Sequence, residues 1–274
     1  MIAMNPYEPQ ICRLVDVQDE TPTIKTFVVE PPEPFEFRAG QFAQLTVPGV
    51  GEAPFTPSSD PAQPQQLDFT VIRTGRVTEA LHELRVGDDV VVGLRGPCGQ
   101  GYPVAEMEGQ HVLVVGGGCG LAPLRSLLYT LFARLDRIRS LTIKYGARES
   151  SELVYRDSYG EWANLPGVSF EETIDVPEPG WSGNVGVVTT LLKELPAPAD
   201  EVVAVSCGPE IMLRFVTLRL LELGLAPERI ILSMNRRMSC GIGKCGRCNI
   251  GPLYLCRDGP DVHYSSIKDL ANVF

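Results

Sequence analysis

The chain has 274 residues, 44% of them hydrophobic and 21% charged, which is typical of a soluble globular protein with one large or two modest domains. Its formal net charge is −10, so it lacks the basic footprint of nucleic-acid-binding proteins. The N-terminus has no secretory signal pattern, and glycines, Pro123 and Arg125 interrupt the longest apolar stretch, so no membrane span is expected. We therefore expect a cytoplasmic protein, in which eight cysteines indicate metal or redox chemistry rather than disulfides.

Short β-branched runs separated by turn residues fill the first hundred residues. They read ICRLVDVQ, IKTFVVEP, QFAQLTVPG, LDFTVIRTG and DDVVVGLRG. Such closely spaced strands predict a small antiparallel β-barrel over residues 1–105. Within it, VTEALHEL has the apolar spacing of one short helix.

From Gln110 onward, strand patterns alternate with helix patterns. The expected strands are HVLVVGGG, SLTIKYGA, VSFEETID, EVVAVSCG and RIILSMN, and the expected helices are LAPLRSLLYTLFARL, GVVTTLLKEL and EIMLRFVTLRLLELG. This alternation predicts an α/β domain over residues 106–234, with a parallel sheet covered by helices on both faces. Gly224 is expected to cap the end of the last helix.

A glycine-rich loop with glycines at 116, 117, 118 and 120 joins the first of these strands to its helix. Glycines there let the backbone approach a phosphate, and the helix N-terminus supplies amide donors. The dinucleotide fingerprint is incomplete, because Pro123 replaces its third glycine and the next strand does not end in an acidic residue. A second loop, SCGPEIM, is expected beside the first at the carboxyl edge of the sheet, where ligands bind. The alternative is a tight strand-to-helix turn without a ligand.

Four cysteines near the C-terminus have the spacing C-x4-C-x2-C-x7-C: Cys240, Cys245, Cys248 and Cys256. A structural zinc site usually has two C-x2-C pairs, whereas only one is present here. The spacing begins as the plant-type [2Fe–2S] pattern does, and the intervening glycines would let backbone N–H groups approach the sulfurs. We therefore predict a [2Fe–2S] segment over residues 235–274, with zinc or disulfides as alternatives. Other strand and helix signals end at about Asn235.

A barrel, a nucleotide domain and a cysteine cluster in this order resemble the ferredoxin–NADP reductase superfamily along essentially the whole chain. Within it, the sequence resembles the flavin-containing γ subunits of cytoplasmic NAD(P)-linked [NiFe] hydrogenases (sulfhydrogenases) and the corresponding electron-transfer component of anaerobic sulfite reductase. The electron-transfer subunit of dihydroorotate dehydrogenase is a more distant match. The matching segments are CGIGKCGRCNIGPLYLCRDGP, the most specific, and EAPFTPSS, GRVTEALHEL, RGPCGQGYP, GGGCGLAPLRSLL and CGPEIML.

The resemblance implies that FAD binds on the barrel. Thr56 would offer its hydroxyl to the reactive N5/O4 edge of the flavin, with Phe55 packed nearby. Ala53 replaces the arginine that usually meets the flavin pyrophosphate, which leaves that role to Arg73 and the following turn and keeps FMN as an alternative. The residues expected at the flavin are Pro54, Phe55, Thr56, Val71, Ile72, Arg73, Gly75, Val77 and Thr78.

The resemblance also implies that the two edge loops hold NAD(P)H, with Cys207 near the nicotinamide. Thr56 and Cys207 are therefore the expected catalytic residues. Tyr145, Gly146 and Arg148 are expected at the adenosine ribose. Arg148 would suit a 2′-phosphate, although nearby acidic residues leave NAD and NADP both open. The residues expected at NAD(P)H are Gly117, Gly118, Gly120, Ala122, Pro123, Tyr145, Arg148, Cys207, Gly208 and Pro209.

These parts together imply an electron-transfer (diaphorase) subunit that links NAD(P)H, FAD and a [2Fe–2S] cluster to a partner. The sequence shows no Ser/His/Asp set, no paired carboxylates and no second metal pattern, so we expect the terminal reaction on an iron–sulfur-containing partner subunit. A [NiFe] hydrogenase is the expected partner. Anaerobic sulfite reductase, dihydroorotate dehydrogenase or another redox complex is the alternative, and a zinc-stabilised structural or regulatory subunit is the alternative of a different class. A stand-alone oxygenase reductase is disfavoured, because the segment after Asn235 is too short for a ferredoxin domain.

Overall fold

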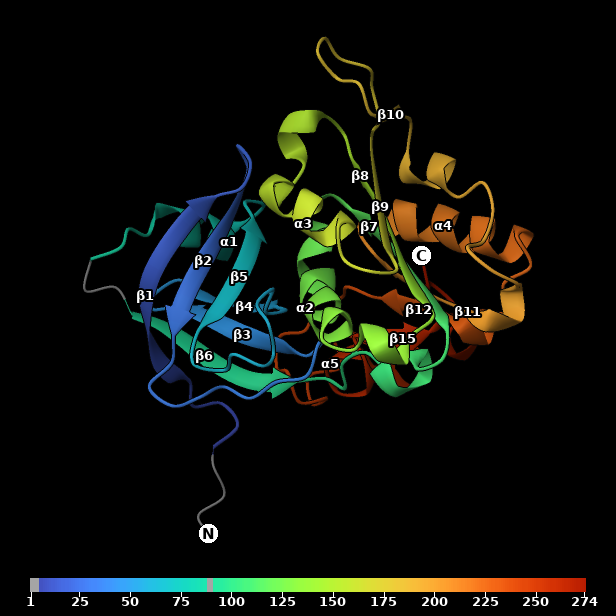
Figure 1. Cartoon of the computed structure of the whole chain (residues 1–274). Coiled ribbons are helices and arrows are strands. Elements are labelled where there is room, and N and C mark those ends of the chain that lie inside the picture. Colours follow the sequence, from blue (N-terminus) through green and yellow to red (C-terminus); the bar gives the residue numbers. More distant parts are fainter. Residues whose placement is uncertain (1–4, 88–90) are drawn as a thin grey trace.

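The computed structural model describes residues 5–87 and 91–274, which form a six-stranded, a seven-stranded and a two-stranded sheet (Figure 1). Figure 1 shows the six-stranded sheet, coloured blue to green, on one side, and the seven-stranded sheet with its helices on the other. In the described part of the chain, no helix is long and apolar enough to cross a membrane.

The first sheet is antiparallel throughout and forms a half-barrel, as the sequence predicts. Its strands are β1 (Gln10–Asp19), β2 (Ile24–Glu30), β3 (Phe42–Val47), β4 (Gly51–Phe55), β5 (Leu67–Ile72) and β6 (Val91–Cys98). Their order in the sheet is β4-β3-β6-β1-β2-β5. Phe27, Leu45 and Phe69 are fully buried in its core. The predicted helix follows β5 as α1 (Arg76–Glu83), whereas β4 is not among the predicted strands.

The second sheet has the order β10-β9-β8-β7-β11-β12-β15, and all its pairings are parallel except the last. Its strands are β7 (His111–Gly117), β8 (Ser140–Ala147), β9 (Val168–Ile174), β10 (Asn184–Val185), β11 (Val202–Cys207), β12 (Ile230–Ser233) and β15 (Asp261–His263). Its helices are α2 (Leu121–Phe132), α3 (Tyr159–Ala163) and α4 (Glu210–Glu222). Short 3-10 turns lie at Val104–Met107, Gly118–Gly120, Leu135–Arg137, Ser150–Glu152, Arg156–Ser158, Val188–Leu191, Ala199–Glu201, Pro227–Arg229 and Tyr264–Ser266.

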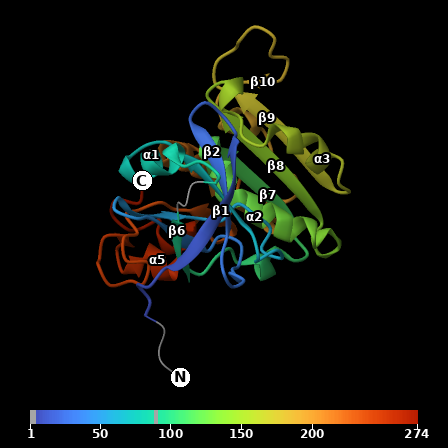
Figure 2. The same cartoon turned by 90° about the vertical axis from the view of Figure 1, so that its left-hand side faces the viewer.

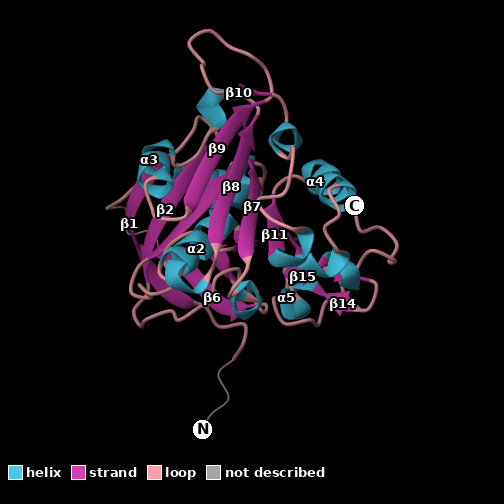
Figure 3. Cartoon of the chain, turned by 45° about the vertical axis from the view of Figure 1, so that its right-hand side comes forward, coloured by secondary structure: helices cyan, strands magenta, loops and turns pink. Residues whose placement is uncertain are grey.

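Both faces of this sheet are covered, as the continuous apolar strands predict. Val112 and Val114 of β7 share a buried cluster with α2, while Leu113 and Val115 share another with α4. Because successive strand residues point to opposite faces, these helices lie on opposite sides of the sheet, as Figure 3 shows. Gly224 has a φ of +87° and ends α4, which confirms the predicted cap.

Two predictions of secondary structure are wrong. GVVTTLLKEL forms only the 3-10 turn Val188–Leu191, because its consecutive β-branched residues are poor helix formers. The segment after Asn235 is not free of regular structure either, since it contains β13 (Asn249–Ile250), β14 (Leu253–Tyr254), α5 (Leu255–Asp258) and β15. In Figure 2 this red segment, with α5, lies beside barrel strand β6.

Candidate cofactor and electron-transfer site

The two predicted nucleotide loops lie together at the carboxyl edge of the second sheet. Strand register places Cys207 opposite Gly116, so the loop after β11 starts beside the loop after β7. A Cβ atom added to Gly120 would lie 2.5 Å from the Cys207 carbonyl oxygen and 2.6 Å from the Gly208 Cα. Only glycine allows this approach. The predicted placement of the two loops is therefore confirmed.

Tyr145 lies beneath the glycine loop rather than on its surface. Its side chain is fully buried, and its hydroxyl donates to the Gly118 carbonyl at 3.0 Å. The same hydroxyl accepts the Val154 N–H at 3.3 Å. The expected contact between this side chain and the adenosine ribose does not fit this position. Arg148, by contrast, is exposed just past the end of β8.

Cys207 is a buried, neutral thiol at the end of β11. Burial outweighs the lowering influence of the Ser233 hydroxyl and raises the pKa of Cys207 to about 12. A thiol in this state has little thiolate character and is a poor nucleophile. A buried thiol at this position could contact and position a nicotinamide.

A buried polar group that no sequence motif signals lies behind Cys207. Asp261 of β15 lies beside Tyr102 and Ser233, and its carboxylate approaches the backbone of Gly40. Burial raises the pKa of Asp261 to about 8, against the lowering influence of the two neighbouring hydroxyls. These residues join the barrel to the C-terminal part of the second sheet, and no local motif signals a contact across so much sequence.

Barrel strand β5 packs against the glycine loop and α2. The Cys119 thiol lies 3.8 Å from the Thr70 carbonyl oxygen, and Arg125 pairs with Asp68 at 3.3 Å. The Tyr155 hydroxyl donates to the Thr70 hydroxyl at 2.5 Å. These contacts bring the end of β5, which carries two of the predicted flavin residues, next to the nucleotide loops.

The turn after β5 differs in part from its predicted role. The Thr78 hydroxyl accepts the Gly75 N–H at 2.8 Å and donates to the Gly75 carbonyl at 2.8 Å. It is therefore engaged in shaping the start of α1 and is not a free phosphate donor. Arg73 is exposed, and the first-turn N–H groups of α1 at Arg76 and Val77 have no acceptor within the helix. These groups still fit a flavin phosphate.

Thr56 and Phe55 lie at the end of β4 and are both half-buried. A half-buried hydroxyl at a strand end can donate a hydrogen bond to an edge atom of a flavin ring bound beside it. Their position fits the flavin role that the resemblance implies.

The four cysteines lie on a compact loop with backbone N–H groups aimed at the sulfurs. Gly243 N–H donates to Cys256 Sγ at 3.0 Å, and Lys244 N–H donates to Cys240 Sγ at 3.2 Å. The Sγ atoms of Cys248 and Cys256 are 3.4 Å apart. Cys245 is exposed, whereas the other three cysteines are buried. The glycines at 241, 243 and 246 all have φ near +73°, the backbone conformation that favours glycine.

The surroundings of Cys240, the first of the four cysteines, favour its thiolate form, which is the form that binds metals. Burial raises the pKa of Cys240, but the N–H groups of Ile242, Cys245 and Lys244 outweigh it and lower that pKa to about 6. Burial and the adjacent Cys248 thiol raise the pKa of Cys256 to about 12. In the described ranges, no three His, Cys, Asp or Glu side chains converge to hold a single metal ion. The donor set of four thiols with sulfur-directed amides fits an iron–sulfur cluster.

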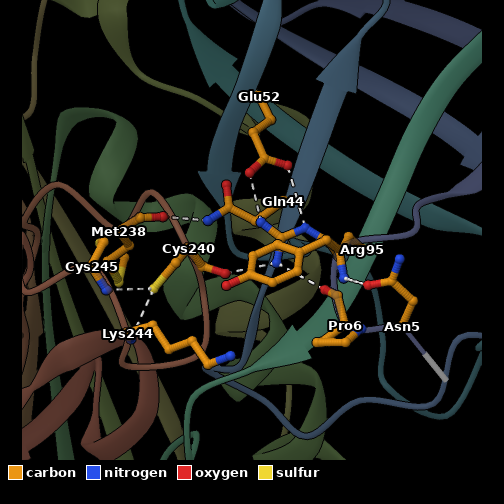
Figure 4. A network of polar contacts seen from close by, with 10 residues as sticks. Asn5, Pro6, Gln44, Glu52, Arg95, Met238, Cys240, Lys244 and Cys245 are labelled. Carbon is orange, nitrogen blue, oxygen red and sulfur yellow. Dashed lines mark hydrogen bonds and ion pairs between the residues drawn. The ribbon is translucent and has the colours of Figure 1, made fainter. Parts of the chain in front are cut away.

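Two buried side chains of the barrel donate hydrogen bonds to the cysteine loop (Figure 4). Arg95 of β6 donates to the Cys240 carbonyl at 2.8 Å, and the Gln44 side chain of β3 donates to the Met238 carbonyl. Beyond β6, the Gln100 N–H donates to the Gly259 carbonyl at 2.7 Å. The predicted flavin barrel and the predicted cluster loop are therefore in direct contact.

Family models match three consecutive parts of the chain. Residues 11–102 match an oxidoreductase FAD-binding domain, residues 114–217 an oxidoreductase NAD-binding domain, and residues 235–268 the iron–sulfur cluster binding domain of dihydroorotate dehydrogenase B. The chain is 34% identical to sulfhydrogenase 2 subunit gamma of Pyrococcus furiosus, over 95% of this chain and 96% of that protein. The chain belongs to this family of FAD- and NAD-binding iron–sulfur oxidoreductase subunits.

Other members of the family are similar along most of the chain. A probable dihydroorotate dehydrogenase B (NAD(+)) electron transfer subunit of Methanocaldococcus jannaschii is 35% identical, over 92% of this chain and 89% of that protein. The solved structure of an NADH-dependent reduced ferredoxin–NADP oxidoreductase, described in work on flavin-based electron bifurcation, is 25% identical. It superposes with a TM-score of 0.75 and covers 97% of this chain and 91% of that one.

Membership of the family assigns the three contacting parts of the chain to one activity, electron transfer. The chain is an oxidoreductase subunit for electron transfer, and its FAD-binding, NAD-binding and iron–sulfur-binding parts follow one another in the sequence. The expected ferredoxin–NADP reductase fold is confirmed by the half-barrel and the mixed sheet.

Proposed function

We propose that this chain is the electron-transfer subunit of a cytoplasmic [NiFe] hydrogenase and moves electrons between NAD(P)H and an iron–sulfur-containing partner subunit. The observation that carries the proposal is the match to a sulfhydrogenase gamma subunit along nearly the full length of both chains. A second gamma subunit from Pyrococcus furiosus is 35% identical over 96% of this chain. A cytoplasmic setting keeps the four thiols reduced for ligation.

The proposed division of the chain follows its three matched parts. Residues 1–105 would bind FAD, residues 106–234 NAD(P)H and residues 235–274 a [2Fe–2S] cluster held by the four cysteines. The C-x4-C-x2-C spacing supports the [2Fe–2S] type. FMN is the alternative flavin, because Ala53 stands at the usual position of the pyrophosphate arginine.

The chain's own residues bind and orient the cofactors. When bound, the flavin exchanges a hydride with NAD(P)H and single electrons with the cluster. Thr56 would hold the flavin's reactive edge. The contact between the glycine loop and the loop after β11 would shape the slot for NAD(P)H, with Cys207 at its inner end. Arg95 and Gln44 hold the cysteine loop against the barrel.

Thr56→Val should slow the reduction of the flavin by NAD(P)H while leaving the fold intact. Valine has the shape of threonine but lacks the hydroxyl that would donate to the flavin, so a loss of about tenfold or more in rate is expected. Anaerobic stopped-flow absorbance of the flavin measures this rate. Thr142→Val on β8 is the matched control and should reduce at the wild-type rate. Equal rates in both variants would rule out the role of Thr56.

Arg148→Glu should shift cofactor preference from NADPH towards NADH. A guanidinium can pair with the 2′-phosphate of NADPH, whereas a carboxylate repels it. The ratio of kcat/KM for NADPH to that for NADH should fall by about tenfold or more. The substitution should raise the KM for NADPH and leave kcat nearly unchanged, because it weakens binding of the cofactor. An unchanged ratio would show that Arg148 does not meet the ribose.

The dihydroorotate dehydrogenase complex is the second candidate. Two probable electron-transfer subunits of this enzyme are 34–35% identical to this chain over 92% of its length, and residues 235–268 match its iron–sulfur cluster binding domain. Anaerobic sulfite reductase is a further alternative, and a zinc-stabilised regulatory subunit is the alternative of a different class.

Isolation of the native complex decides among these candidates. A partner that contains nickel and consumes hydrogen with NAD(P)+ would support the proposal. A partner that oxidises dihydroorotate or reduces sulfite would replace it with the corresponding alternative. Stoichiometric zinc on the four cysteines, with no flavin, would refute electron transfer.

A further inference from the structure

Arg95 is a buried cation directly behind the first cysteine of the cluster loop. Its side chain is 4% exposed, on strand β6 of the barrel. One end of the guanidinium, Nη1, donates to the Cys240 carbonyl at 2.8 Å and to the Pro6 carbonyl at 3.3 Å. Figure 4 shows this end of Arg95 turned towards the cysteine loop.

The other end of the guanidinium is paired with a carboxylate. Glu52 of β4 accepts from Nη2 at 2.6 Å and from Nε at 3.3 Å. The Glu52 side chain is 33% exposed, so water screens its charge more than that of Arg95. The ion pair is therefore oriented, with its buried positive end towards the cysteine loop and its partly solvated negative end away from it.

The approach of Arg95 to the loop leaves little room for a side chain at position 241. A Cβ atom added to Gly241 would lie 3.2 Å from Arg95 Nη1 and 3.0 Å from the Cys98 sulfur. Gly241 also has a φ of +73°. The backbone conformation of Gly241 therefore favours glycine, and a side chain there would press on Arg95 and Cys98.

We propose that Arg95 is a positioning residue that holds the Cys240–Gly241 loop and raises the reduction potential of the cluster bound there. The inference rests on the cluster ligation in the proposed function. Reduction adds one electron, supplied by NAD(P)H through the flavin, and so one negative charge. The guanidinium carries a positive charge, and in a poorly solvated site this charge stabilises the added electron.

A purely mechanical role predicts something different. Gln44 and Gln100 also fasten the segment to the barrel, through the carbonyls of Met238 and Gly259. If Arg95 were one more such fastening, its loss would lower thermal stability or iron retention. The reduction potential of the cluster that is retained would not change.

Arg95→Gln and Glu52→Gln test the charge directly, because they remove opposite members of the same pair. Potentials are measured by redox titration of the full chain with EPR detection of the cluster and optical detection of the flavin. The potential of the cluster should move negative in Arg95→Gln and positive in Glu52→Gln. Arg95→Lys keeps the positive charge but cannot make the paired hydrogen bonds of a guanidinium. Its cluster should therefore have a reduction potential near that of the wild type, while the protein should have a lower melting temperature.

Arg13→Gln is the matched control, since Arg13 is an exposed barrel arginine paired with Glu30. Its cluster should titrate at the wild-type potential. Wild-type potentials in both Arg95→Gln and Glu52→Gln would overturn the proposal. If Arg95→Gln does not retain iron, Glu52→Gln decides alone. A positive shift of its cluster potential would support the proposal, and an unchanged or negative potential would overturn it. Failure of the wild-type chain to bind iron and sulfide would instead count against the proposed function.

Discussion

Cys248→Ser is expected to abolish electron delivery to one-electron acceptors while NAD(P)H still reduces the flavin. Cys248 is fully buried and its sulfur lies 3.4 Å from that of Cys256, so serine there would remove a thiolate from the centre of the ligand set. Hydroxyls ligate iron–sulfur clusters poorly, and we expect the rate to the acceptor to fall by about 100-fold or more. Anaerobic cytochrome c reduction and stopped-flow flavin absorbance separate the two steps.

Cys98→Ser is the matched control for this loss. Cys98 is also buried and its sulfur lies near Gly241, yet it is not one of the four predicted ligands. Its variant should keep iron, sulfide and both rates. A Cys248→Ser chain that retains its full iron content, or that loses flavin reduction as well, would contradict the proposed order of the electron path.

Gly120→Ala is expected to weaken NAD(P)H binding while leaving flavin and iron content unchanged. The new methyl group would stand 2.5 Å from the Cys207 carbonyl oxygen and would force the two nucleotide loops apart. Overpacking of this kind costs about 1–3 kcal/mol, and if that cost falls on the bound state KM should rise by roughly 5- to 100-fold. Steady-state kinetics at varied NAD(P)H concentration measure the change.

Gly117→Ala is the control that distinguishes the clash at the Cys207 backbone from the effect of adding any methyl group to the glycine loop. Its added methyl group would collide with the Met212 sulfur, but a methionine side chain can move away, unlike the backbone at Cys207. The rise in KM should therefore be clearly smaller in Gly117→Ala. Equal effects of the two substitutions would show that the close backbone contact does not define the NAD(P)H slot.

The sequence predicts the features of this protein that depend on local patterns. Strand alternation, the glycine loop after β7 and the cap at Gly224 each follow from residues close together in the chain. The cysteine spacing likewise carries its meaning within one short segment. The error at GVVTTLLKEL is also local, since apolar spacing there favours a helix while the β-branched residues oppose one.

Side-chain environments formed by distant segments could not be predicted in this way. Tyr145 stands where a ribose contact is expected, but its burial under Gly118 depends on how β8 pairs with β7. Arg95 has the pattern of an ordinary strand residue, and its contact with Cys240 spans 145 positions. Asp261 meets Tyr102 only because β15 joins the second sheet next to β12.

We propose that one chain carries electrons from NAD(P)H through a flavin to a [2Fe–2S] cluster on the four C-terminal cysteines. Anaerobic titration of the purified chain with NAD(P)H, followed by EPR at low temperature, tests it most directly. This electron path should give about two irons and two sulfides per chain and a reduced [2Fe–2S] signal that develops after the flavin absorbance bleaches. A chain that contains zinc, or iron that stays EPR-silent while the flavin is fully reduced, would contradict it.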